Sequence, residues 1–119
     1  MSELAATFAA LRAILLPYAD ALDIKADTAT DLYLDTRHIQ KNRKPLFFGA
    51  VAVRRRYVSF HLMPVYVQPA LVATLSPALR KRMQGKSCFN FVEVDETLFT
   101  ELAALTNAGF ESYRKLGFV

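Results

Sequence analysis

The sequence contains a single cysteine, Cys88, among its 119 residues. One cysteine excludes an internal disulfide framework, so we expect a protein of a reducing compartment, with the cytoplasm as its default location. The only histidines are His38 and His61. Transition metals need clustered histidine, cysteine or carboxylate ligands at set spacing, and these three residues offer no such cluster. We therefore expect no cofactor.

The sequence also lacks an apolar run close to the ~20 residues that span a membrane. Its first 18 residues are apolar, but they include Glu3, lack a basic start and show a helical period, so we expect neither a signal peptide nor a membrane partner. With 53% hydrophobic and 22% charged residues, the chain is not of the disordered class. We expect one globular domain over residues 1–119.

Acidic residues are missing between Thr36 and Val92, where the chain holds eleven lysines and arginines. The rest of the chain holds four basic and eleven acidic residues, so the net charge of +4 combines a middle segment at +11 with flanks at −7. This asymmetry fits an anionic partner, contacts between the middle and the flank of two copies, or cations spread over solvated loops. The candidate anion-binding residues are Arg37, Lys41, Arg43, Lys44, Arg54, Arg55 and Arg56.

Nucleic acid is the less favoured anionic partner. No recognised nucleic-acid-binding motif accompanies the candidate cations. They also precede and follow one expected strand, so they are expected at its two opposite ends and not in a single patch.

Four segments have the pattern of strands. Residues 46–53 and 57–67 are apolar runs rich in Phe and Val, and they are expected to form a hairpin through the exposed turn of Arg54, Arg55 and Arg56. In residues 28–36 and 87–94, apolar and polar side chains alternate, which predicts strands with one buried face.

Helical periodicity predicts an N-terminal helix that Ser2 caps and Pro17 kinks or ends, and a long C-terminal helix that Asp95 caps. One or two short helices are expected over residues 69–83, with Pro77 after Ser76 as a start signal. Parallel strand–helix–strand alternation is absent. The sequence therefore predicts an α+β fold, with an antiparallel sheet of about four to five strands and the N- and C-terminal helices packed on one face.

A single helical layer leaves the other face of the sheet open. Strand alternation places nine residues on that face: Asp31, Tyr33, Phe47, Val51, Ser59, His61, Met63, Cys88 and Asn90. Because this surface is too apolar to stay bare, we expect it to form a homodimer surface or a groove for a small molecule. The candidate ligand-binding residues are Tyr33, Ser59, His61, Met63, Cys88 and Asn90.

We expect no catalytic residues. The segment Gly85-Lys86-Ser87 lacks the upstream glycine of a phosphate-binding loop, because position 80 is an arginine. A nucleophile at Cys88 or Ser59 would need His61 as its base, and that proximity depends on an assumed strand order. A small buried thiol and a surface or interface histidine are the simpler interpretations.

Five aspartates recur at a spacing of three or four residues: Asp20, Asp23, Asp27, Asp31 and Asp35. A continuous helix would align them as an acidic ridge whose oxygens suit a hard cation, which makes them a candidate iron site. The strand expected over residues 28–36 would divide this ridge between a helix end and a strand. Ordinary solvated carboxylates are the alternative.

Two segments, KPLFFGAVAVRRRYVSFHL (44–62) and GKSCFNFVEVD (85–95), resemble the YdhG-like domain-of-unknown-function family. The match rests on Lys44-Pro45-Leu46, Val58-Ser59-Phe60 and Gly85-Lys86-Ser87-Cys88. The family commonly has a Gly- and Pro-containing turn after its first strand, and residues 36–44 contain neither. The resemblance implies a fold similar to that of frataxin-type proteins and, for some members, an iron-chaperone role. It implies no catalytic residues.

The sequence therefore predicts a cytoplasmic, non-catalytic domain that dimerises or binds a small molecule through its open sheet face. Iron carriage by the aspartates and anion or nucleic-acid binding by the basic middle segment are the alternatives.

Overall fold

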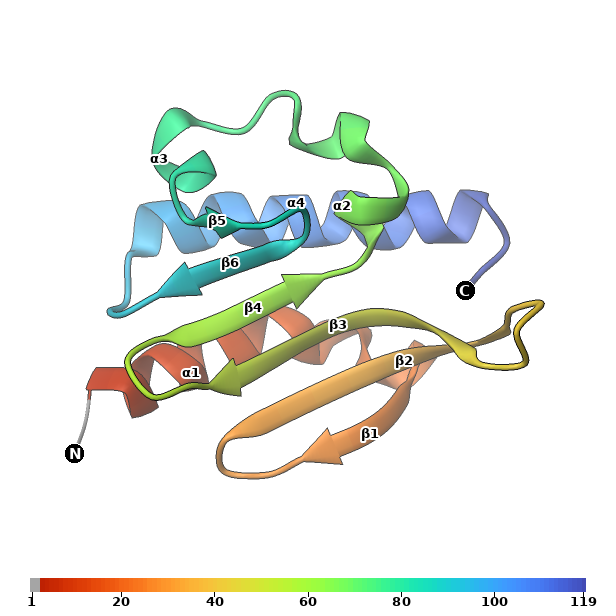
Figure 1. The fold of residues 1–119 in the computed structure, drawn as a ribbon, viewed down its shortest axis with the longest axis horizontal. Coiled ribbons are helices and arrows are strands. Elements are labelled where there is room, and N and C mark those ends of the chain that lie inside the picture. Colours follow the sequence, from red (N-terminus) through yellow and green to blue (C-terminus); the bar gives the residue numbers. More distant parts are fainter. Residues whose placement is uncertain (1–2) are drawn as a thin grey trace.

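The computed structural model describes residues 3–119 and contains two long helices, several short helical turns and one sheet (Figure 1). In chain order the elements are α1 (Glu3–Leu15), η1 (Leu16–Ala21), β1 (Asp23–Asp27), β2 (Asp31–Ile39), β3 (Pro45–Val53), β4 (Val58–Leu62), α2 (Pro64–Val67), η2 (Pro69–Val72), α3 (Pro77–Arg80), β5 (Met83–Gln84), β6 (Cys88–Phe91) and α4 (Glu96–Lys115). The helix cap predicted at Ser2 lies outside the described residues.

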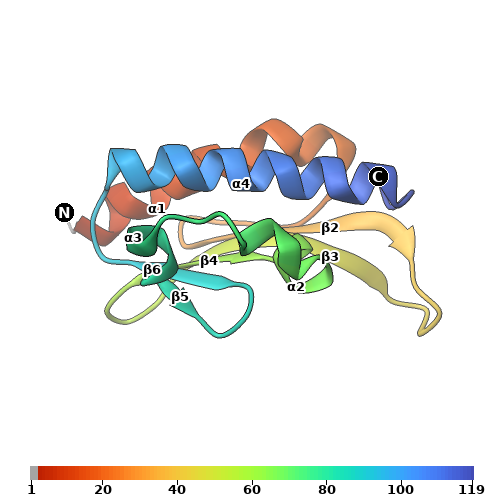
Figure 2. The same cartoon turned by 90° about the horizontal axis from the view of Figure 1, so that it is seen from above.

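All strand pairs in the sheet are antiparallel, and the spatial order is β1-β2-β3-β4-β6-β5. Helices α1 and α4 lie side by side on one face of the sheet, as the sequence predicts (Figure 2). The six strands include two that the sequence pattern did not reveal, β1 and β5. The first has the sequence DIKAD, which is not an apolar run, and the second has only two residues.

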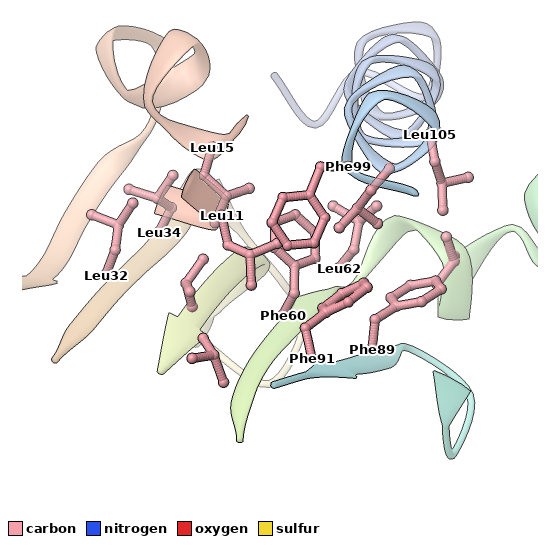
Figure 3. Packing of buried hydrophobic residues seen from close by; sticks show 14 of the residues in the cluster. Leu11, Leu15, Leu32, Leu34, Phe60, Leu62, Phe89, Phe91, Phe99 and Leu105 are labelled. Carbon is pink, nitrogen blue, oxygen red and sulfur yellow. The ribbon is translucent and has the colours of Figure 1, made fainter. Parts of the chain in front are cut away.

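The core lies between the helices and the sheet. Figure 3 shows side chains of α1 and α4 meeting those of β2, β4 and β6. The fully buried side chains include Leu11, Leu15, Leu32, Leu34, Phe60, Leu62, Phe89, Leu102 and Tyr113. The predicted cap of α4 is confirmed, because the Asp95 carboxylate accepts the Leu98 N–H (3.0 Å). The predicted helix start after Ser76 is also confirmed at α3, where the Ser76 hydroxyl accepts the Leu79 N–H (3.1 Å).

The helical stretch Glu3–Ala21 is long and apolar enough to cross a membrane when only length and composition are considered. Core helices pass the same test. In this structure Leu11 and Leu15 on this stretch are fully buried between α1 and the sheet.

The strand predicted over residues 57–67 is shorter than expected. Strand β4 ends at Leu62, and Pro64 begins the helical turn α2. Proline suits the first turn of a helix because its missing N–H would have no helical partner there. Met63 therefore precedes a helix and does not continue the strand, so its predicted place on the open strand face is wrong.

A bulge in β3 reverses the predicted alternation of side chains. Leu34 pairs with Gly49, whereas the next residue of β2, Asp35, pairs with Phe47, so β3 has one extra residue at Phe48. Phe47 faces the open side, as the sequence predicts, and Phe48 is buried, but the residues after the bulge change face and Val51 is fully buried. The predicted exposure of Val51 on the open face is therefore wrong.

Neighbouring groups approach the backbone closely at Gly49. A Cβ atom there would lie 3.1 Å from the His61 carbonyl oxygen and 3.2 Å from Leu15 Cδ2. The glycine thus allows α1 to pack directly on the bulge, which keeps the helical layer close to the strand that carries the open-face residues.

Candidate functional site

The open face of the sheet has two rows of side chains, which the strand register fixes. In the first row, Tyr33 pairs with Ala50, Ala50 with His61, and His61 with Cys88. The second row runs across Asp31, Ala52, Ser59 and Asn90 in the same way. Three of the four central positions hold small side chains, Ala50, Ala52 and Ser59, and His61 is the fourth, so the face is low around these three residues.

These small side chains form the floor of a groove of about 420 Å³. Of the six ligand-binding residues predicted from the sequence, the structure brings four to this groove: Tyr33, Ser59, His61 and Cys88. Asn90 lies on the same face but outside the groove lining, and Met63 lies beyond the end of β4. Lys25, Asp31 and Arg54 add charged groups to the lining.

An aromatic wall consists of Tyr33, Phe47 and His61: Tyr33 and His61 line the groove, and Phe47 packs against both from outside the lining. The rings of Tyr33 and Phe47 are stacked, with centroids 4.6 Å apart, and the Phe47 ring meets His61 edge-on at 4.8 Å. The buried Tyr113 hydroxyl donates a hydrogen bond to the Phe47 carbonyl oxygen (2.9 Å), which ties the bulge to α4. The wall is therefore held from the core side, and Tyr33 remains 40% exposed on the groove side.

His61 forms a hydrogen bond with Ser87, with 2.8 Å between Nε2 and Oγ. Ser87 is only 8% exposed, and it lies in the turn before β6. Burial lowers the pKa of His61, so the imidazole is neutral at neutral pH. The sequence analysis did not include Ser87, because it treated Gly85-Lys86-Ser87 only as a phosphate-loop candidate. The β4–β6 register, which pairs His61 with Cys88, places the preceding residue Ser87 beside His61.

We predict that the stability of the protein falls as the pH is lowered from 7.5 to 5. The folded pKa of His61 lies below the value of about 6.5 expected for the unfolded chain, so the unfolded state binds more protons in this window. Urea denaturation at several pH values measures the effect. The fall should be smaller in His61→Gln, which cannot titrate, and should persist in Ser87→Ala, which keeps the imidazole. An equal fall in all three proteins would contradict the prediction.

Cys88 is half-buried opposite His61. Burial raises the pKa of its thiol, and this outweighs the opposing effects of a hydrogen bond with Ser59 and the charge of Arg54. A thiol with a raised pKa is mostly protonated at neutral pH and is a poor nucleophile. The arrangement therefore suits a small groove-floor side chain better than a reactive group.

The seven candidate anion-binding cations lie in two groups at opposite ends of β3, as the sequence predicts. Arg37 forms a salt bridge with Asp23 (Nε to Oδ1, 3.3 Å). Lys41 lines a second cavity, of about 530 Å³, with Leu46, Val67 and Phe118. The others are Arg43 and Lys44 in the β2–β3 turn, and Arg54, Arg55 and Arg56 in the β3–β4 turn; of these, Arg54 alone lines the open-face groove.

The structure does not assemble the five aspartates into one site. Asp20 lies in η1, Asp23 and Asp27 in β1, and Asp31 and Asp35 in β2. Asp27 forms a bidentate ion pair with Arg12 (2.8 and 3.0 Å), and the Asp31 carboxylate accepts the Thr30 hydroxyl (2.7 Å). Within residues 3–119, no three His, Cys, Asp or Glu side chains are grouped so that they could hold a metal ion.

Two of the five aspartates, Asp23 and Asp35, are direct partners in the β1–β2 register. Asp35 is almost fully buried, and burial raises its pKa, with a smaller lowering by Lys25 and a smaller raising by Asp23. This pair lies on the edge-strand side of the open face.

Comparison of the chain with protein-family models, with curated proteins and with solved structures finds no match.

Proposed function

We propose that this protein is a non-catalytic binding domain that holds a small molecule with a planar apolar part in the groove on its open sheet face. The observation that carries the proposal is the floor of small side chains, Ala50, Ala52 and Ser59, beside the stacked rings of Tyr33 and Phe47. Ligand pockets are concave and mostly apolar, with a few polar groups that fix orientation.

Rigidity supports the same function. The floor lies on three paired strands, and the aromatic wall is fixed by the hydrogen bond from Tyr113 to the Phe47 carbonyl oxygen. A groove built on paired strands needs little ordering when a ligand enters, so less binding free energy is lost to conformational entropy.

Catalysis has less support than binding. His61 and Ser87 resemble a base and a nucleophile, but the Ser87 side chain is nearly buried and does not line the groove. His61 accepts or donates no other side-chain hydrogen bond among residues 3–119, so no described carboxylate orients its ring as in a catalytic triad. The pair is better suited to holding the imidazole as part of the groove wall.

The proposal is tested with planar aromatic fragments such as indole and quinoline, titrated into ¹⁵N-labelled protein. We expect the amide signals of Tyr33, Ala50 and His61 to shift, and Tyr33→Ala to weaken binding about tenfold because a stacking face is lost. Tyr57→Ala is the matched control, since Tyr57 is 37% exposed, close to the 40% of Tyr33, but lies in the β3–β4 turn outside the groove lining. Equal losses in both variants, or no shift at the groove, would contradict the proposal.

A second copy of the chain is the other occupant that the sequence predicts for this face. It would bury Tyr33 and the groove floor and remove the cavity. Sedimentation velocity over a hundredfold range of concentration distinguishes a small molecule from a second copy as the occupant. A groove for small molecules requires that the face is free in a monomer. A dimer that dissociates in the Tyr33→Ala variant would favour self-association.

The cytoplasmic location and the resemblance to the YdhG-like family stay predictions. Iron carriage gains no support from the dispersed aspartates, and nucleic-acid binding gains none from basic groups at opposite ends of β3.

A further inference from the structure

The open-face groove contains a cation without an ionic partner. Arg54 lines the groove where β3 ends, and the salt bridges among residues 3–119 involve Arg12, Arg37 and Arg114, not Arg54. Its side chain also makes none of the hydrogen bonds found in the described chain. Its charge lowers the pKa of the Cys88 thiol, although burial has the larger, opposite effect. A guanidinium that lines a groove and has no carboxylate partner of its own is ready to bind an anion.

The other charged groups of the groove do not neutralise Arg54. Lys25 interacts with Asp35, whose pKa it lowers, so this cation is partly balanced within the protein. Asp31 also lines the groove, but its carboxylate accepts the Thr30 hydroxyl and is more than 4.0 Å from any described cation. The lining therefore has two cations and one carboxylate, which is an excess of positive charge.

The cation and the aromatic wall lie toward different ends of the groove. Tyr33 is in the row of Ala50 and His61, whereas Arg54 lies two residues beyond Ala52, past the row of Ser59. The low floor connects them. A ligand that contacts both must be apolar and flat at one end and negatively charged at the other.

We infer that the ligand of this groove is a planar aromatic acid, with its ring against Tyr33 and its carboxylate on Arg54. This inference rests on the proposed binding function. The carboxylate matches the fork of the guanidinium, which can donate two parallel hydrogen bonds. A volume of about 420 Å³ is toward the small end for ligand pockets, so an acid with one or two rings is the appropriate size.

The test compares 2-naphthoate with its uncharged analogue 2-naphthalenemethanol by calorimetric titration at low salt. We expect the acid to bind at least about tenfold more tightly, because a charge-assisted hydrogen bond to arginine is then available. Arg54→Gln should remove that advantage. Arg55→Gln is the matched control, because it removes the same charge from the adjacent exposed residue that does not line the groove, and it should change the affinity less than about twofold.

The outcomes separate this inference from the proposed function. If the acid and the alcohol bind equally, or if both arginine variants weaken the acid equally, the groove binds aromatic molecules and the assignment to Arg54 is wrong. If neither probe binds and no fragment shifts the groove signals, the proposed function fails as well. Circular dichroism and thermal unfolding are the controls that check whether both arginine variants are folded.

Discussion

Gly109→Ala is expected to destabilise the protein by about 1–3 kcal/mol, although alanine normally favours a helix over glycine by about 1 kcal/mol. Gly109 lies inside α4 and is buried against α2. A Cβ atom at this position would lie 2.8 Å from Pro64 Cβ and 3.2 Å from Pro64 Cγ. A proline ring is rigid and fixed to the backbone, so either α4 or α2 must move.

Urea denaturation of Gly109→Ala measures this effect, and a double-mutant cycle with Pro64→Gly supplies the control. Pro64→Gly removes both ring atoms that the new methyl group meets, so Gly109→Ala should be much less harmful, or stabilising, in that background. A stabilising effect of Gly109→Ala in the wild-type background would show that α4 and α2 are farther apart at this point than the distances to Pro64 imply.

Ala50→Leu is expected to weaken binding of planar aromatic molecules by at least about a hundredfold. Ala50 lies between Tyr33 and His61 in the floor of the groove, and a leucine there adds three carbons to space that the ligand needs. One misplaced methylene in a pocket changes affinity by about 10–200-fold, so three carbons at the floor should close it. Because the side chain projects away from the helical layer, the core should be unaffected.

Two measurements accompany Ala50→Leu. Its free energy of unfolding should stay within about 1 kcal/mol of the wild type, since surface substitutions usually have small effects. Ala104→Leu, at an exposed position of α4, is the matched control and should bind aromatic probes as the wild type does. Undiminished binding to Ala50→Leu would mean that ligands use another surface.

The parts of the fold that follow from local patterns were predictable from the sequence. Alternation in residues 28–36 places Leu32 and Leu34 in the core, and both are fully buried. Helix starts at Ser76 and Asp95 follow from side chains that accept backbone N–H groups nearby, which depends on a few neighbouring residues.

The parts that depend on distant neighbours were not predictable. The bulge at Phe48 lies next to Gly49, where α1 packs closely on β3, and the apolar sequence of β3 fits either face equally well. Strand β1 is an edge strand whose only strand neighbour is β2, and its sequence alone has no strand pattern. Val51 was therefore assigned to the wrong face.

The candidate site was also predictable only where its residues follow a local pattern. Tyr33, Ser59, His61 and Cys88 lie in strands whose alternation is regular, and the strand order brings them to one groove. Met63 failed because Pro64 begins a helical turn. The contact of Ser87 with His61, and the position of Arg54 in the groove lining without Arg55 or Arg56, depend on strand register and turn geometry, which no single-sequence pattern contains.

The most direct test of the account follows the methyl signals of Ala50 and Ala52 in ¹H–¹³C spectra while 2-naphthoate is added. These methyl groups are the floor of the groove, so a bound aromatic ring must lie over them. We expect both signals to shift together and to saturate at one molecule per chain. Unchanged alanine signals, with shifts instead at Leu46 and Val67 of the second cavity, would contradict the account.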